Sequence, residues 1–78
     1  MGRSEGKEGK TRLDIDFFEE RRDEEKLTYE GLSAKSGVSV TTIWRITKGM
    51  EIRTENAERI ANALRVSLES LIDRKSVV

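Results

Sequence analysis

The chain contains no cysteine, no histidine and no proline among its 78 residues. Without cysteine, neither a disulfide framework nor a thiolate metal site can form. The absence of histidine removes the commonest general base and the commonest metal ligand. Since the chain also shows no nucleophile–base pair and no metal-ligand spacing, we expect a protein that is not an enzyme and uses no metal and no cofactor.

Long apolar segments are lacking as well. No apolar run approaches the roughly 20 residues that cross a bilayer, and no signal peptide is visible. A chain of 78 residues makes one domain, near the lower size at which a single core folds unaided. We therefore expect a soluble cytoplasmic protein without a membrane partner.

Neither sign of charge dominates the composition, because 15 basic and 15 acidic residues give a net charge of zero. The charges are nevertheless unevenly distributed. Residues 1–13 carry a net charge of +2, residues 14–26 carry −4, residues 27–49 carry +2, and the remainder balances. Overall neutrality argues weakly against nucleic-acid binding and implies that any phosphate contact surface is modest in size.

The middle of the chain has the pattern of two short amphipathic helices joined by a tight turn. Thr28 begins the first helix as a good N-cap, since its hydroxyl can accept a free backbone N–H. Gly37 supplies the turn, which requires a conformation that a residue without Cβ adopts cheaply. Ser39 caps a second helix that ends at Gly49. This arrangement predicts a helix-turn-helix.

The two sides of the second helix differ sharply. With about 100° between successive residues, Ile43, Ile46 and Met50 fall on one side. The opposite side carries no acid and is formed by Thr41, Trp44, Arg45 and Lys48, with Val40 at its boundary. Such a face suits a polyanion groove, because Arg and Lys bind guanine or phosphate and a Thr methyl contacts a thymine methyl. The alternative is a solvated face with one isolated tryptophan.

The segments before this motif have different compositions. Residues 1–13 are rich in glycine and charge and have no apolar periodicity, so we expect a flexible N-terminal tail. The tail is either a basic arm that contacts DNA or a solubilising segment. An acidic helix follows from Asp14, with Ile15 and Phe18 on its apolar side, and we expect it to face away from DNA. Arg22 also lies on the apolar side and has either a phosphate or an internal carboxylate as its partner.

Two further helices follow Gly49. Thr54 is the expected N-cap of the first, whose apolar side includes Ile60 and Leu64. Ser67 caps a final helix that we expect to end near Lys75. Together these patterns predict an all-α fold of five helices, with a folded domain over residues 14–75, a C-terminal tail over residues 76–78 and no strand.

The chain from about Phe18 to Ile72 resembles the DNA-binding domain of the lambda repressor-like family, which includes Cro and the XRE-type regulators. The stretches that carry the likeness are LTYEGLSAKSGVSVTTIWRITKG and ENAERIANALRVSLESLI. The positions that match the family pattern as they stand are Leu27, Leu32, Gly37, Val38, Ser39, Ile43, Ile46, Gly49, Ala63, Leu64, Val66, Ser67 and Leu71.

The resemblance implies a compact five-helix domain that binds operator DNA as a dimer, with the third helix in the major groove. The base-reading positions that it implies are Val40, Thr41, Trp44 and Arg45. The phosphate contacts that it implies come from Tyr29, Ser39, Thr42, Lys48 and Arg53, and helix N-termini add free backbone N–H groups.

Five positions depart from the family pattern. Tyr29 replaces the usual Gln that binds a phosphate, and Ser33 replaces the usual Ala between the two helices of the motif. Arg21 stands where the family often has an apolar residue. Arg65 replaces a glycine, so a left-handed conformation there would cost roughly 1 kcal/mol. Trp44 is the least typical residue, and it either stacks on DNA or belongs to a protein interface.

The predicted function is that of a sequence-specific DNA-binding transcriptional regulator, a repressor, located in the cytoplasm and nucleoid-associated when bound to DNA. We expect a homodimer on a near-palindromic operator, because a monomer of this size makes few contacts. The predicted dimer surface consists of Leu68, Leu71, Val77 and Val78. The alternative is a protein-interaction module of the same fold, antitoxin-like or an anti-repressor subunit, that binds a regulatory protein partner and not DNA.

Overall fold

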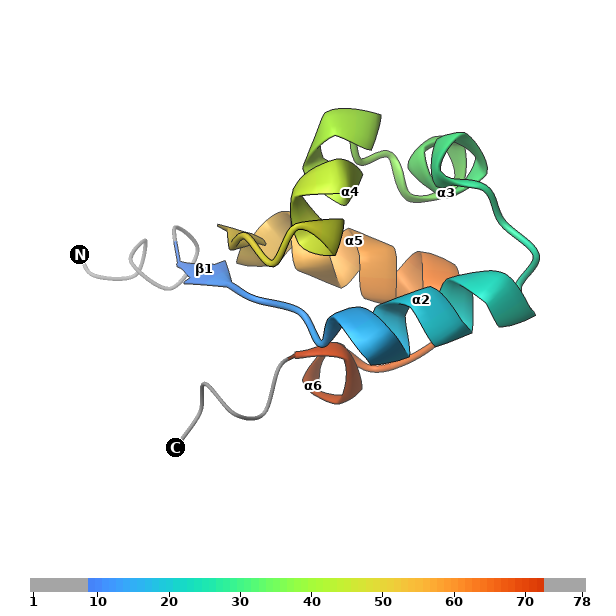
Figure 1. Cartoon of the computed structure of the whole chain (residues 1–78). Coiled ribbons are helices and arrows are strands. Elements are labelled where there is room, and N and C mark those ends of the chain that lie inside the picture. Colours follow the sequence, from blue (N-terminus) through green and yellow to red (C-terminus); the bar gives the residue numbers. More distant parts are fainter. Residues whose placement is uncertain (1–8, 73–78) are drawn as a thin grey trace.

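The computed structural model describes residues 9–72 (Figure 1). Its elements are β1 (Lys10–Thr11), α2 (Ile15–Glu24), α3 (Tyr29–Ser36), α4 (Val40–Thr47), β2 (Ile52–Arg53), α5 (Thr54–Leu64) and α6 (Leu68–Leu71). The five helices confirm the expected helical fold class. Within the described residues, no helix has the length and apolar composition that a membrane span needs.

Side-chain caps and left-handed residues define the ends of the helices. The hydroxyl of Thr28 accepts the backbone N–H of Gly31, and the hydroxyl of Ser39 accepts that of Thr42. Gly37 ends α3 with a φ of 79°, a left-handed conformation that favours glycine. These contacts confirm the predicted boundaries of the helix-turn-helix.

The hydrophobic core surrounds α5, which packs against α3 and α6 and contacts both strands. In Figure 1, α2 and α4 lie on opposite sides of α5. The apolar side chains that face the core share near-complete burial, and the largest of them are Phe18, Leu32, Val38, Ile43, Ile46, Ile60, Leu64 and Leu71. Ile43 and Ile46 of α4 and the apolar side predicted for α5 are therefore buried as their spacing indicated.

A two-stranded antiparallel sheet is the main departure from the predicted all-helical fold. Lys10 pairs with Arg53 and Thr11 pairs with Ile52. The prediction of a flexible tail is wrong for residues 9–13, because Leu13 belongs to the core with 2% of its surface exposed. Strands of two residues are too short to show an apolar alternation in the sequence. Residues 1–8 of the expected tail, and the expected C-terminal tail, lie outside the described residues.

The start of α5 also differs from the prediction. Its N-cap is Arg53, which makes no side-chain capping bond, and Thr54 is the first helical residue. The hydroxyl of Thr54 donates instead to the carbonyl oxygen of Gly9 at 3.1 Å, and its backbone N–H donates to the same oxygen at 3.0 Å. Thr54 therefore holds β1 beside β2, a contact across 45 residues that local sequence cannot reveal.

Two further predictions at helix ends need correction. Met50 was expected on the buried side of α4, but half of its surface is exposed. The reason is that α4 ends at Thr47 and Gly49 then adopts a φ of 81°, so that Met50 no longer follows the helical spacing. The last helix, α6, ends at Leu71, whereas we expected it to reach Lys75, which lies outside the described residues.

Candidate nucleic-acid interface

The helix α4 has one buried and one exposed side. Ile43 and Ile46 lie in the core and attach the helix to the domain. Thr41, Arg45 and Lys48 are exposed, and Trp44 exposes 50% of its surface. Because α4 contains no acidic residue, the exposed side can approach a polyanion without a repelling carboxylate on the same helix.

The turn between α3 and α4 packs against the core. Val38 in the turn is buried, and the hydroxyl of Ser33 donates to its carbonyl oxygen at 2.6 Å. Ser33 occupies the position where the family usually has Ala, so this serine adds a hydrogen bond to the turn. The turn is therefore anchored to the domain from which the exposed side of α4 projects.

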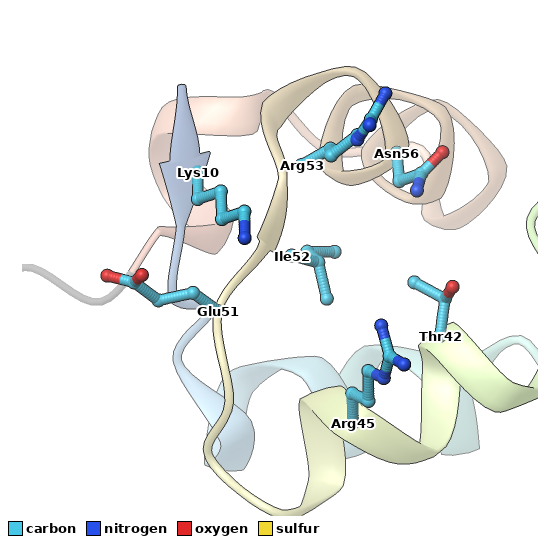
Figure 2. Close-up of a pocket in the computed structure, with 7 residues that line it drawn as sticks. All are labelled: Lys10, Thr42, Arg45, Glu51, Ile52, Arg53 and Asn56. Carbon is cyan, nitrogen blue, oxygen red and sulfur yellow. The ribbon is translucent and has the colours of Figure 1, made fainter. Parts of the chain in front are cut away.

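A polar cleft lies between α4 and the small sheet. Its volume is about 390 Å³, and it is lined by Lys10, Thr42, Arg45, Glu51, Ile52, Arg53 and Asn56. Figure 2 shows the side chains of Lys10 and Arg45 reaching toward each other past Ile52. Three cationic side chains and one carboxylate give the lining a net positive charge, which favours an anion.

The structure brings some of the predicted DNA-contacting residues together in this cleft and leaves others elsewhere. Arg45, Thr42 and Arg53 share the cleft, whereas Trp44 and Lys48 lie on the exposed surface outside it. Asn56 lines the same cleft and was not predicted. Lys10 also lines it and belongs to the N-terminal segment for which a DNA-contacting basic arm was one of two predictions, but its place next to α4 follows only from the pairing of β1 with β2.

Ser39 and Val40 lie at the N-terminal end of α4. The hydroxyl of Ser39 is exposed, caps the helix through the Thr42 backbone N–H, and lies 3.1 Å from the Thr42 hydroxyl. Val40 is half-buried, at the boundary of the two sides as its spacing predicted. Ser39 therefore presents a hydroxyl, and Val40 an apolar side chain, at the N-terminal end of α4.

Tyr29 is engaged inside the protein. Its hydroxyl donates to Glu19 Oε2 at 2.7 Å, and the Arg22 guanidinium lies 4.6 Å from the ring centroid. The hydrogen bond to Glu19 stabilises the protonated phenol, and partial burial adds to this effect, so the pKa of Tyr29 is raised above its ordinary value. A phosphate contact by this hydroxyl therefore requires it to leave Glu19.

The partner of Arg22 is an internal carboxylate, one of the two alternatives that the sequence left open. Its Nη2 lies 2.8 Å from Glu19 Oε1, and its Nη1 donates to the carbonyl oxygen of Leu27 at 2.6 Å. Arg22 thus connects α2 to the start of α3. Arg21, which departs from the family pattern, donates to the carbonyl oxygen of Leu64 at 3.1 Å.

The predicted dimer surface is only partly available. Leu71 has 0% of its surface exposed, so its assignment to a dimer surface is wrong. The helix α6 folds back onto α5 and directs this side chain into the core. Leu68 is half-buried against the same core, and Val77 and Val78 lie outside the described residues.

The described residues offer no evident place for a metal, because no group of three or more His, Cys, Asp or Glu side chains within residues 9–72 is arranged to hold one.

Comparison with known proteins assigns the class of domain. The model of the helix-turn-helix family matches residues 18–71, from α2 to α6. This match spans more than half of the chain, so the protein belongs to the lambda repressor-like helix-turn-helix family, as its resemblance predicted. Membership in this family of DNA-binding regulatory domains indicates a DNA-binding regulator. No significant match to the chain was found among curated proteins or among solved structures.

Proposed function

We propose that the protein is a sequence-specific transcriptional repressor that inserts α4 into the major groove of a near-palindromic operator as a homodimer. The observation that carries this proposal is the acid-free exposed side of α4, which lies beside a cleft with three cationic side chains. A major groove admits an α-helix, and its base edges are hydrogen-bonded by the side-chain types present here.

Base reading is assigned to the exposed side of α4. Arg45 suits guanine, because a guanidinium can donate to both O6 and N7. The Thr41 methyl suits a thymine methyl, and Val40 adds apolar contact at the start of the helix. Trp44, with half of its surface exposed, stacks on the sugar and thymine methyl groups beside them.

Phosphate contacts position α4 in the groove. Ser39 and Thr42 place hydroxyls at the N-terminal end of α4, and Lys48 and Arg53 place cations beyond its C-terminal end. Such contacts fix orientation without reading sequence. Tyr29 joins them in this proposal by exchanging Glu19 for a phosphate oxygen as the acceptor of its hydroxyl.

Dimerisation doubles the contact surface of a small domain. Two copies related by a two-fold axis place their α4 helices in successive major grooves about 34–36 Å apart, which requires a near-palindromic site. Leu68 and the C-terminal residues Val77 and Val78 are proposed as the contact between the copies. Repression then follows from competition with other proteins for the operator.

A selection from random duplexes tests the proposal. The purified protein is incubated with a pool of random double-stranded oligonucleotides, and bound duplexes are amplified and sequenced. We expect enrichment of a near-palindromic site, whose affinity falls linearly with salt on logarithmic axes. A pool without an enriched sequence after repeated cycles would contradict the proposal.

The exposed apolar residues of α4 and its following loop support a second candidate function. Trp44 and Met50 are the large hydrophobic side chains that stand exposed among residues 9–72. Tryptophan is enriched at the centres of protein interfaces. In this alternative, the α4 side binds a regulatory protein, as an antitoxin-like or anti-repressor subunit does. The random-duplex selection then yields no site, and the Trp44→Ala substitution abolishes binding of the protein partner.

A further inference from the structure

Two cations oppose each other across the small sheet. Lys10 of β1 and Arg53 of β2 are register partners, and both are exposed. Directly opposed side chains of an antiparallel pair lie on the same face, with their Cβ atoms about 4.5–5.5 Å apart. Like charges in this position destabilise the pairing. Figure 2 shows the two side chains turned apart, Lys10 toward Ile52 and Arg53 toward Asn56. An anion that contacts both would draw them together and offset the repulsion.

The surroundings of this pair are also suited to an anion. Arg45 lies across the cleft as a third cation, and Thr42 and Asn56 add groups that can donate hydrogen bonds. Within residues 9–72, neither Lys10 nor Arg53 nor Arg45 forms a salt bridge. Figure 2 shows the carboxylate of Glu51, the acidic residue of the lining, pointing away from Arg45 and Arg53. The three cations of the cleft therefore form no ion pair within this part of the chain, and the lining keeps a net positive charge.

The backbone, and not the lysine side chain, holds Lys10 in place. Both the backbone N–H and the hydroxyl of Thr54 donate to the Gly9 carbonyl oxygen, which fixes the residue before Lys10. The side chain is thus left available for a ligand. Lys10 lies outside residues 18–71, the range that the family model matches.

We propose that Lys10 and Arg53 form a cross-strand binding site for a phosphate group, with Arg45 adding positive potential from the opposite wall. Resting on the proposed function, the ligand is a phosphodiester of the DNA backbone at the edge of the groove that α4 enters. The cleft of about 390 Å³ has room for a phosphate and its waters, since water occupies about 30 Å³ per molecule. Because β1 supplies Lys10, pairing of β1 with β2 completes this site.

Substitution of Lys10 tests the site in the full-length protein. Lys10→Gln should weaken binding roughly fivefold to tenfold at about 0.1 M salt, and reduce the slope of log affinity against log salt by about 0.9, for one lost phosphate contact. The loss should be equal for the selected operator and for an unrelated duplex, because phosphate contacts carry no sequence information. Lys10→Arg should retain wild-type affinity.

A charge-matched control separates this site from the general effect of removing a lysine. Lys35 is exposed in α3 and lies 4.0 Å from Glu25, away from the cleft. Lys35→Gln should therefore keep the wild-type affinity and salt slope. The unfolding temperature of Lys10→Gln should equal or exceed that of the wild type, because the substitution removes the repulsion from Arg53.

The outcomes distinguish this site from the proposed function. If the wild type binds its selected duplex and Lys10→Gln binds it equally, with the same salt slope, the phosphate site is refuted and the proposed function stands. A second measurement follows the backbone amide NMR signals of Lys10 and Arg53 during titration with inorganic phosphate. If the wild type binds no duplex, the proposed function fails. In that case, changes of the amide signals with phosphate that Lys10→Gln abolishes support a site for free phosphate. If the amide signals do not change with phosphate, the site is refuted as well.

Discussion

Replacement of Arg65 by glycine should stabilise the protein. Arg65 follows α5 with φ 64° and ψ 40°, a left-handed conformation that costs a residue with a Cβ about 1–2 kcal/mol. Its backbone N–H donates to the carbonyl oxygens at the end of α5, a contact that glycine keeps. The side chain is exposed and forms no salt bridge within residues 9–72, so its removal costs little folding free energy.

The gain is partly offset in the unfolded state. Glycine makes the unfolded chain more flexible, which costs about 0.4–1 kcal/mol. With the middle of each range, the net stabilisation of Arg65→Gly should be about 0.8 kcal/mol. For a domain of this size, about 1 kcal/mol raises the unfolding temperature by roughly 4–8 °C, so we expect an increase of about 3–6 °C.

Thermal and urea unfolding followed by circular dichroism measure this change. Lys26→Gly is the matched comparison, since Lys26 is the other residue with a Cβ and a positive φ in the described chain, at 57°. Gly37→Ala is the reverse test: its φ is 79° and the added Cβ would lie 4.0 Å from Arg59, so any loss reflects backbone strain alone. An unfolding temperature of Arg65→Gly at or below the wild-type value would refute the reasoning.

Four further substitutions test the interface and the core. Arg45→Ala should weaken operator binding by about 1–3 kcal/mol and relax specificity at one position, measured by fluorescence anisotropy with single-base operator variants; an unchanged site would remove Arg45 from base reading. Because the pKa of Tyr29 is raised by its bond to Glu19 and by burial, its contribution to stability is fully present below pH 10.0 and is lost as pH rises through the raised value. The stability advantage of the wild type over Tyr29→Phe should therefore shrink above pH 10.0 in unfolding measurements, and a constant difference would contradict this account. Leu71→Ala should destabilise the protein by about 2–5 kcal/mol, because Leu71 is fully buried. Leu68→Ser should instead lower the dimer content in sedimentation analysis more than it lowers the stability of the fold. A loss of dimer from Leu71→Ala alone, or a loss of stability from Leu68→Ser alone, would contradict the assignment of Leu71 to the core and Leu68 to the dimer contact.

The features that the sequence predicted correctly are those decided within a few neighbouring residues. Thr28 and Ser39 cap their helices because an N-cap hydroxyl needs only the backbone N–H of a residue three positions later. Gly37 turns the chain because its own φ is left-handed. The ordered apolar spacing around Ile43 and Ile46 then determined which side of α4 is buried.

The candidate interface depended on contacts that no local pattern encodes. Tyr29 had the position of a phosphate ligand, but Glu19 of another helix accepts its hydroxyl. Leu71 was assigned to the dimer surface as part of the apolar side of the last helix, but the packing of α6 on α5 buries it in the core.

The placement of Lys10 is the clearest case of a tertiary decision. From the sequence, Lys10 is one cation in a glycine-rich, charged segment. Pairing of β1 with β2 places it opposite Arg53 and beside α4, more than 30 residues away along the chain. Spacing along the chain sets which side of a helix is apolar, because helical geometry repeats every few residues. Which distant charges become neighbours is set by strand register, and this is defined only once the core has closed.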